Sequence, residues 1–213
     1  MLKIHQCICL GCAIDRHALD LHGSFSWIAD PGERIARAST AIALQDGWLL
    51  VDPVEAPGLD VALAERPVRG IVLLMARHRR DSEAVAARHG VAGQLVDDGA
   101  PLPFAGVQVR RTLRRPGWQE ALLWLDDRGL LVVGDLYGTL PYFLTGSDVL
   151  GMHPALRPLP PRLGLAELRP RAIAVGHGRP VTNGAAEALE LAERTALRGL
   201  PRNWWHIVRT RGH

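Results

Sequence analysis

The sequence has almost no lysine. Among its 213 residues Lys3 is the only one, and every other basic side chain apart from histidine is arginine. The formal net charge is only +3, from 25 basic and 22 acidic residues, and the two signs are interspersed along the chain. A nucleic-acid-binding domain usually gathers its basic residues on one face. We therefore expect no nucleic-acid partner.

Long apolar runs are missing as well. No run reaches the roughly 18 to 20 residues that are needed to span a bilayer, so we expect no membrane partner. Residues 1–15 contain a short apolar stretch, but His5 and Gln6 interrupt it and it is too short for an export signal. We expect a cytoplasmic protein.

Cysteine is scarce and confined to one place. Cys7, Cys9 and Cys12 are the only three, and His5 stands beside them. Four nitrogen and sulfur ligands suit a structural zinc ion, although this spacing is not a standard zinc-finger pattern. The alternative is that these cysteines are simply small buried residues. A disulfide is less expected in a cytoplasmic protein.

The sequence does contain many short strand-like runs with a few helical segments between them. Asp46-Gly47 is a strong hairpin-turn dipeptide, and Gly90 is suited to the end of a helix. Strands are predicted at 24–30, 39–45, 47–53, 70–75, within 93–98 and 106–113, and at 119–127, 129–138 and 171–181; helices are predicted at 59–66, 81–89 and 184–200. Residues 153–164 are so rich in proline that they predict a surface loop.

Because helices flank the strands instead of forming a separate block, the order favours a layered α/β architecture. We expect one domain over residues 1–213, with no internal repeat. The predicted fold class is a four-layer αββα sandwich of two mixed β-sheets flanked by helices.

Four landmarks occur in order along the chain: GWLLVDP at 47–53, RHRRD at 77–81, LLVVGDLYG at 130–138 and AVGHGRPV at 174–181. In this order and spacing the sequence resembles the metallo-β-lactamase superfamily, the αββα hydrolase fold that includes glyoxalase II-like enzymes. The resemblance covers most of the chain, from about residue 39 to the final helix. Each landmark alone is unspecific.

The resemblance implies a site for two metal ions. In that family a His-x-His-x-Asp-His turn, a later Gly-His, a bridging Asp and a final Gly-His-Gly hold the metals, which generate hydroxide from water near neutral pH. In this sequence the corresponding positions hold mostly other residue types: Arg77, Arg79, Asp81, Ser82, Trp118, Asp135 and His177. Arginine has no lone pair to offer a metal, so we expect the first metal site to be lost and no cofactor to be needed.

Asp81, Asp135 and His177 keep ligand character, so the alternative is a hydrolase that uses one Zn, Fe or Mn ion. Against this, arginines within about 4 Å of the ion would each oppose it by on the order of 4 kcal/mol at an effective dielectric of 20. Arg77 and Arg79 are instead expected to pair with the aspartates. Asp81 also stands where it could cap a helix.

The arginines suggest another ligand. A pocket of guanidinium groups suits a carboxylate or phosphate, and the candidates for binding a small anion are Arg77, Arg79, Arg80, Arg114 and Arg115. A third possibility is a structural or interaction module, working as a monomer or homodimer. Trp204 and Trp205 would then form a contact, or simply pack on the sandwich. His78, at a variable position of the motif, is expected to face solvent.

Overall fold

A computed structural model describes residues 14–96 and 101–201. The first part of the chain forms a six-stranded sheet in the order β1-β2-β3-β4-β5-β6. Its first four strands are antiparallel neighbours, and β4, β5 and β6 are parallel. The strands are β1 (Asp15–Ala18), β2 (Phe25–Ile28), β3 (Ala38–Ala43), β4 (Trp48–Val51), β5 (Val68–Leu73) and β6 (Gly93–Leu95).

The second half forms a four-stranded sheet in the order β12-β9-β8-β7, in which only β12 and β9 are parallel. Its strands are β7 (Gln108–Arg115), β8 (Trp118–Leu125), β9 (Leu130–Val132) and β12 (Ala172–Ala174). The short strands β10 (Tyr137–Gly138) and β11 (Gly151–Met152) pair with each other. Both large sheets are therefore mixed, as predicted.

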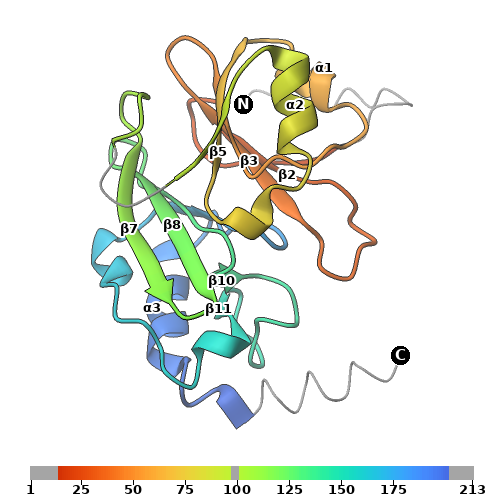
Figure 1. Cartoon of the computed structure of the whole chain (residues 1–213). Helices are drawn as coiled ribbons and strands as arrows, with labels where there is room; N and C mark the ends of the chain where they lie inside the picture. Colours follow the sequence, from red (N-terminus) through yellow and green to blue (C-terminus); the bar gives the residue numbers. More distant parts are fainter. Residues whose placement is uncertain (1–13, 97–100, 202–213) are drawn as a thin grey trace, which may run out of the picture.

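The helices lie on the outer faces of the two sheets (Figure 1). The helices α1 (Leu59–Leu63) and α2 (Ser82–His89) pack on the six-stranded sheet, and α3 (Ala185–Thr195) packs on the other side of the molecule. Gly90 ends α2 with a positive φ of 64°, as its position in the sequence predicted. The part of the chain that the structure describes also contains the 3₁₀ turns η1 (Ala76–His78), η2 (Pro154–Leu156) and η3 (Leu165–Leu168).

Alternation along the strands divides the core into two layers. On β3, Ala41 and Ala43 belong to the cluster that includes α1 and α2, whereas Ile42 belongs to the cluster between the sheets. On β4, Leu50 faces the helices while its two neighbours face the second sheet. Successive side chains of a strand point to opposite faces, so the six-stranded sheet is buried on both sides. The predicted αββα order of layers is confirmed.

The predicted surface loop at 153–164 was only partly right. Pro154 and Leu156 are buried in η2, and Arg157 is only 1% exposed. The Arg157 guanidinium donates hydrogen bonds to the carbonyls of Met152, Phe143 and Ala196. The high proline content predicted a surface loop, but composition does not show which carbonyl groups a single arginine will bind. The buried position of Arg157 was therefore not predicted.

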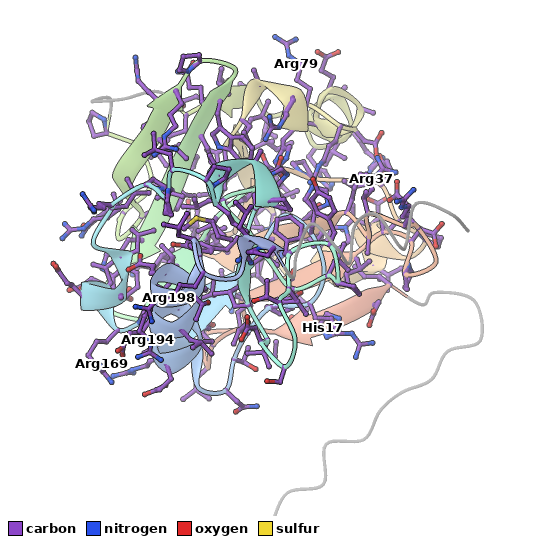
Figure 2. The ribbon with its side chains drawn as sticks, turned by 90° about the horizontal axis from the view of Figure 1, so that it is seen from below. His17, Arg37, Arg79, Arg169, Arg194 and Arg198 are labelled. Atoms are coloured by element: carbon purple, nitrogen blue, oxygen red, sulfur yellow. The ribbon has the colours of Figure 1, made fainter. Side chains whose placement is uncertain are left out.

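Most arginines outside the core lie at the periphery. Figure 2 shows Arg79 at one end of the molecule and Arg169, Arg194 and Arg198 around α3 at the other. Arg169 pairs with Glu187 at 3.4 Å, and Arg194 pairs with Glu190 at 3.6 Å. None of the helices within residues 14–96 and 101–201 has the length and apolarity that a membrane span requires.

Candidate functional site

The site lies where strands of the two sheets end. Asp52 follows β4, His78 is the last residue of η1 after β5, Asp135 follows β9, and His177 follows β12. Two backbone contacts join the sheets here. Arg37 and His177 form an isolated antiparallel β-bridge, and the Ala38 amide donates a hydrogen bond to the Gly176 carbonyl at 2.9 Å. Four segments that are distant in the sequence therefore bring polar side chains together just after their strands.

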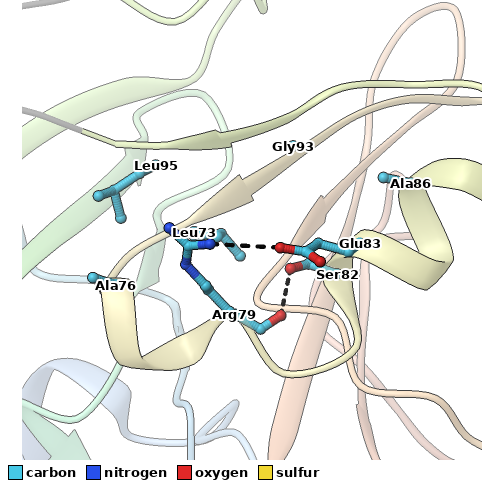
Figure 3. A pocket seen from close by; sticks show the side chains of 8 residues that line it. All are labelled: Leu73, Ala76, Arg79, Ser82, Glu83, Ala86, Gly93 and Leu95. Carbon is cyan, nitrogen blue, oxygen red and sulfur yellow. Dashed lines mark hydrogen bonds and ion pairs between the residues drawn. The ribbon is translucent and has the colours of Figure 1, made fainter.

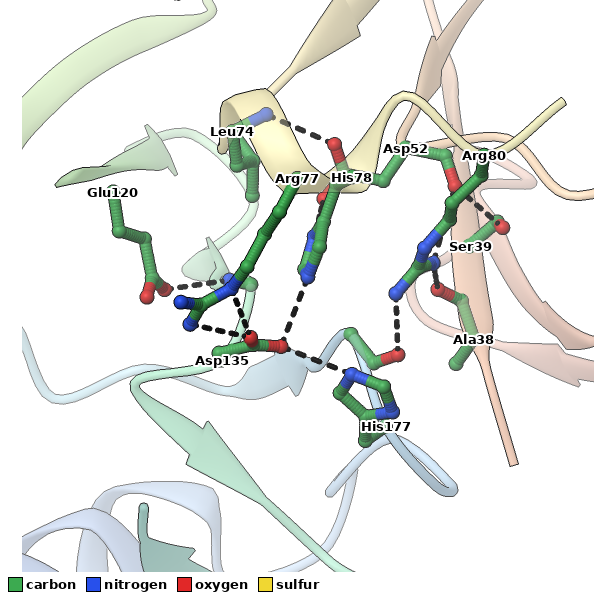
Figure 4. Close-up of polar contacts among 12 residues, drawn as sticks. Ala38, Ser39, Asp52, Leu74, Arg77, His78, Arg80, Glu120, Asp135 and His177 are labelled. Carbon is green, nitrogen blue, oxygen red and sulfur yellow. Dashed lines mark hydrogen bonds and ion pairs between the residues drawn. The ribbon is translucent and has the colours of Figure 1, made fainter. Parts of the chain in front are cut away.

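Asp135 is the centre of the site and accepts hydrogen bonds from three side chains (Figure 4). Arg77 donates to Oδ2 through Nε at 2.9 Å and Nη2 at 2.7 Å. His78 Nε2 lies 2.9 Å from Oδ1, and His177 Nε2 lies 3.0 Å from the same oxygen. Burial would raise the pKa of Asp135, but the hydrogen bonds of both histidines hold it well below its usual range.

His78 connects Asp135 to a second buried carboxylate. Its Nδ1 lies 2.7 Å from Oδ2 of Asp52, whose Oδ1 accepts from the Leu74 amide at 2.9 Å. Burial would lower the pKa of His78, but the charge of Asp52 and the hydrogen bonds to both aspartates outweigh it and raise the pKa to about 9. His78 is therefore protonated at neutral pH.

The expectation that His78 faces solvent was wrong, because the residue is only 4% exposed. Its ring fits between two glycines. A Cβ at Gly134 would meet Cε1 of His78 at 3.3 Å, and one at Gly176 would meet it at 3.2 Å and the Gly134 carbonyl oxygen at 2.7 Å. The 3₁₀ turn rotates position 78 inward, which a motif with position 78 as a spacer cannot reveal.

Arg77 and Arg79 were both expected to pair with the aspartates. The expectation is confirmed for Arg77, which pairs with Asp135, and is wrong for Arg79, which pairs with Glu83. The guanidinium carbon of Arg77 also lies 4.3 Å from the ring centroid of Trp118, a cation–π contact. The Trp118 indole N–H donates to Oε2 of Glu120 at 3.1 Å. Arg77 and Trp118, at two positions that the resemblance assigns to metal ligands, thus contact each other.

Glu120 is a fully buried acid that the sequence analysis missed. Its Oε1 accepts from the backbone amides of Gly134 at 2.8 Å and Leu136 at 3.1 Å, on both sides of Asp135. Burial, with the nearby charge of Asp135, raises the pKa of Glu120 to about 7. A lone glutamate inside the apolar run QEALLWL was the available signal, because a buried acid needs partners.

The other predicted residues of the motif lie apart from Asp135. Arg79 is exposed and pairs with Glu83 at 3.5 Å, and the Ser82 hydroxyl donates to the Arg79 carbonyl. Asp81 is at the N-cap position of α2 but makes no side-chain cap; its Oδ2 accepts from the Glu55 amide at 2.9 Å. The predicted cap is therefore wrong in its hydrogen bond, although right in its position.

The five arginines proposed for anion binding have different environments. Arg80, with φ of 45°, donates to the carbonyls of Ala38, Asp52 and Gly176, and Arg115 on β7 donates to the Leu159 carbonyl. Arg114 also lies on β7. Arg77 and Arg80 interact with the aspartates of the site.

A cavity of about 210 Å³ opens beside Arg79 (Figure 3). Its walls come from the end of β5, from β6 and from the first turns of α2. Leu73, Ala76, Arg79, Ser82, Glu83, Ala86, Gly93 and Leu95 line it. No residue of the Asp135 cluster contributes to it, although Arg79 and Ser82, two of the positions that the resemblance assigns to metal ligands, do.

Metal-ligand chemistry is present at one place within residues 14–96 and 101–201. His78, Asp135 and His177 can each direct a ligand atom to a common point, and these atoms all lie within 4.8 Å of one another. Asp81 is not part of this group. The predicted cluster of His5, Cys7, Cys9 and Cys12 and the tryptophans at 204 and 205 lie outside the described residues.

No family model matches the sequence, and no curated protein matches it. Solved structures do. A flavoprotein from Thermotoga maritima aligns with a TM-score of 0.60 and 16% identity over 86% of this chain and 62% of its own. A flavo di-iron protein from the same organism aligns at 0.53 and 15%, with the same coverage.

A third match is an NDM/FIM-1-like metallo-β-lactamase from Erythrobacter litoralis in its mono-zinc form. It aligns with a TM-score of 0.54 and 15% identity over 84% of this chain and 97% of its own. Identities this low establish the arrangement of the backbone and not the chemistry. The layers, the order of strands and these similarities agree: the chain has the metallo-β-lactamase fold.

Proposed function

We propose that this protein has lost the two-metal hydrolysis of metallo-β-lactamase-fold enzymes and that it binds a small anion. The ion pair between Arg77 and Asp135 carries the proposal. By the resemblance, Asp135 stands where an aspartate bridges two metals, and Arg77 stands where a histidine binds one of them. The guanidinium takes up one oxygen of that carboxylate and has no lone pair for a metal.

The neighbouring positions support the same conclusion. Positions 79, 82 and 118 hold arginine, serine and tryptophan. Arg79 is directed to Glu83 at the surface, and the Trp118 indole N–H is bonded to Glu120. The donor set of a two-metal centre does not fit these residues, so no catalytic step is assigned to such a centre.

The charge of the site favours an anion. Arg77, Arg80 and protonated His78 surround Asp52 and Asp135, so the cations outnumber these carboxylates. The pKa of Glu120, raised to about 7, keeps much of this acid neutral at physiological pH. Arg77 is 44% exposed along its side chain, and a planar guanidinium suits a carboxylate or phosphate.

The test is anion binding by isothermal titration calorimetry with phosphate, malonate and citrate. We expect binding that Arg77→Gln weakens at least 10-fold. Arg79→Gln is the matched control, because it removes an arginine two residues away that does not contact Asp135, and we expect it to leave binding unchanged. Absence of binding at millimolar anion would refute the anion part of the proposal.

The loss of hydrolysis is tested separately with a chromogenic β-lactam, a thioester and a phosphodiester, each with and without added Zn²⁺. We expect no turnover above the buffer rate. Zinc-stimulated turnover that disappears in Asp135→Asn would contradict this part.

The two other predicted functions have less support. A hydrolase with one metal on Asp81, Asp135 and His177 would need Asp81, which is bonded to the Glu55 amide outside the group of possible ligands. The interaction module was predicted to use Trp204 and Trp205, which lie outside the described residues, and the proline-rich segment 153–164 gives it little surface because part of it is buried.

A further inference from the structure

The two histidines of the site converge on a single oxygen atom. Nε2 of His78 and Nε2 of His177 lie 2.9 and 3.0 Å from Oδ1 of Asp135, and both rings point at this carboxylate (Figure 4). An ion bound at about 2.1 Å by all three atoms in tetrahedral geometry would hold them roughly 3.4 Å apart. Each nitrogen–oxygen distance would have to lengthen by about half an ångström to reach this value, and all three atoms already lie within 4.8 Å of one another.

The opposite nitrogen of each ring is already anchored. His177 Nδ1 lies 2.6 Å from the Ile35 carbonyl oxygen, which can only accept, so Nδ1 carries the hydrogen and Nε2 is the nitrogen that can coordinate. His78 Nδ1 is held in the same way by Asp52, at 2.7 Å. Histidine ligands of metals usually donate their second N–H to a carboxylate or a carbonyl. Both rings therefore have the outer hydrogen bonds of metal ligands.

Arg77 does not occupy the carboxylate oxygen that faces the two histidines. Its guanidinium donates both of its hydrogen bonds to Oδ2 of Asp135, whereas His78 and His177 lie against Oδ1. The oxygen that would bind a metal is therefore separate from the oxygen that Arg77 holds.

We propose that His78, Asp135 and His177 bind one divalent transition-metal ion, with Asp52 and the Ile35 carbonyl positioning the two imidazoles. The ligand position after β5 has moved by one residue, from 77 to 78, so this site differs from the one implied by the resemblance. Two imidazoles and one carboxylate suit Zn²⁺ or Fe²⁺. The inference does not rest on the proposed anion binding, and either can fail without the other.

The experiment uses the full chain stripped with EDTA and titrated with Zn²⁺ by calorimetry, and with Co²⁺ by visible absorption. We expect one ion per chain. We expect His177→Gln and His78→Gln to weaken binding at least 100-fold, and Asp52→Asn to weaken it about 10-fold, as is typical of outer-shell residues. The matched control is His22→Gln, an exposed histidine outside the site, with unchanged affinity. Circular dichroism checks that each variant is folded, and His177→Gln tests the proposal if His78→Gln does not fold.

The cysteines near the N-terminus could bind the same ions, so a variant with Cys7, Cys9 and Cys12 all changed to serine is part of the experiment. We expect it to keep the ion at the site and to show the same cobalt spectrum, without thiolate charge-transfer bands. Loss of the ion in the serine variant would overturn the proposal. So would unchanged binding in His177→Gln, or no binding by the starting protein at 1 mM metal.

Discussion

The protein is expected to become less stable as the pH rises, because His78 and Glu120 are buried beside Asp135 and both have raised pKa values. The pKa of His78 is raised from 6.5 to about 9, so folding favours its protonated form. This stabilisation is fully present below pH 6.5 and is lost as the pH rises through 9. At 1.36 kcal/mol per pKa unit it amounts to roughly 3 kcal/mol.

Glu120 acts with the same sign in a lower pH range. Its pKa is raised from 4.5 to about 7, so the neutral acid is favoured by the fold, and this contribution, again about 3 kcal/mol, is lost between pH 4.5 and 7. A domain of this size has about 5 to 15 kcal/mol in total. We therefore expect maximum stability near pH 5 and a steep decline toward pH 9.

Urea unfolding at pH 5, 7 and 9, followed by the fluorescence of the buried Trp27 and Trp48, measures this decline. His78→Gln should flatten the curve between pH 7 and 9 and leave the decline between 5 and 7. Glu120→Gln should do the reverse. A starting protein with the same free energy of unfolding at all three pH values would refute the reasoning, and so would a His78→Gln variant that keeps the full decline above pH 7.

Three further changes test the packing and charge of the site. Gly176→Ala should destabilise the fold by about 2 kcal/mol, because its Cβ would lie 2.7 Å from a backbone oxygen; Gly93→Ala, which meets nothing within 4 Å, is the control in the same urea titration. Arg157→Met should cost about 3 kcal/mol, because three carbonyls lose their donor; an unchanged thermal midpoint would contradict this. Asp52→Asn should lower the pKa of His78 from about 9, measured by NMR titration of its ring protons, and an unshifted titration would show that Asp52 does not raise it.

The layers of the fold were predictable because they follow from local patterns. Alternation on β3 and β4, the hairpin dipeptide at 46–47 and the glycine after α2 each depend on a few neighbouring residues, so a sequence pattern predicts them. The buried position of Arg157 could not be predicted in this way, because its three acceptors come from segments up to 39 residues away in the sequence.

The sequence predicted which strand ends form the site, but only some of the residues that meet there. Asp135 and His177 were found because each follows a strand in a recognisable landmark. His78 was missed because a motif with fixed spacing assigns position 78 to solvent, while η1 turns it into the gap between Gly134 and Gly176. That rotation depends on how β5 ends against the second sheet, which no local pattern encodes.

Arg77 and Arg79, which stand where the resemblance implies histidines, have different environments. A buried carboxylate without a counter-charge is costly by several kcal/mol, so Asp135 favours a cation beside it. Arg77 supplies it, held by Asp135 on one side and the Trp118 ring on the other. Arg79 has no such partner at the site and pairs with Glu83 at the surface instead. Two arginines two residues apart therefore have different partners, and the buried carboxylate of Asp135 beside Arg77 accounts for the difference.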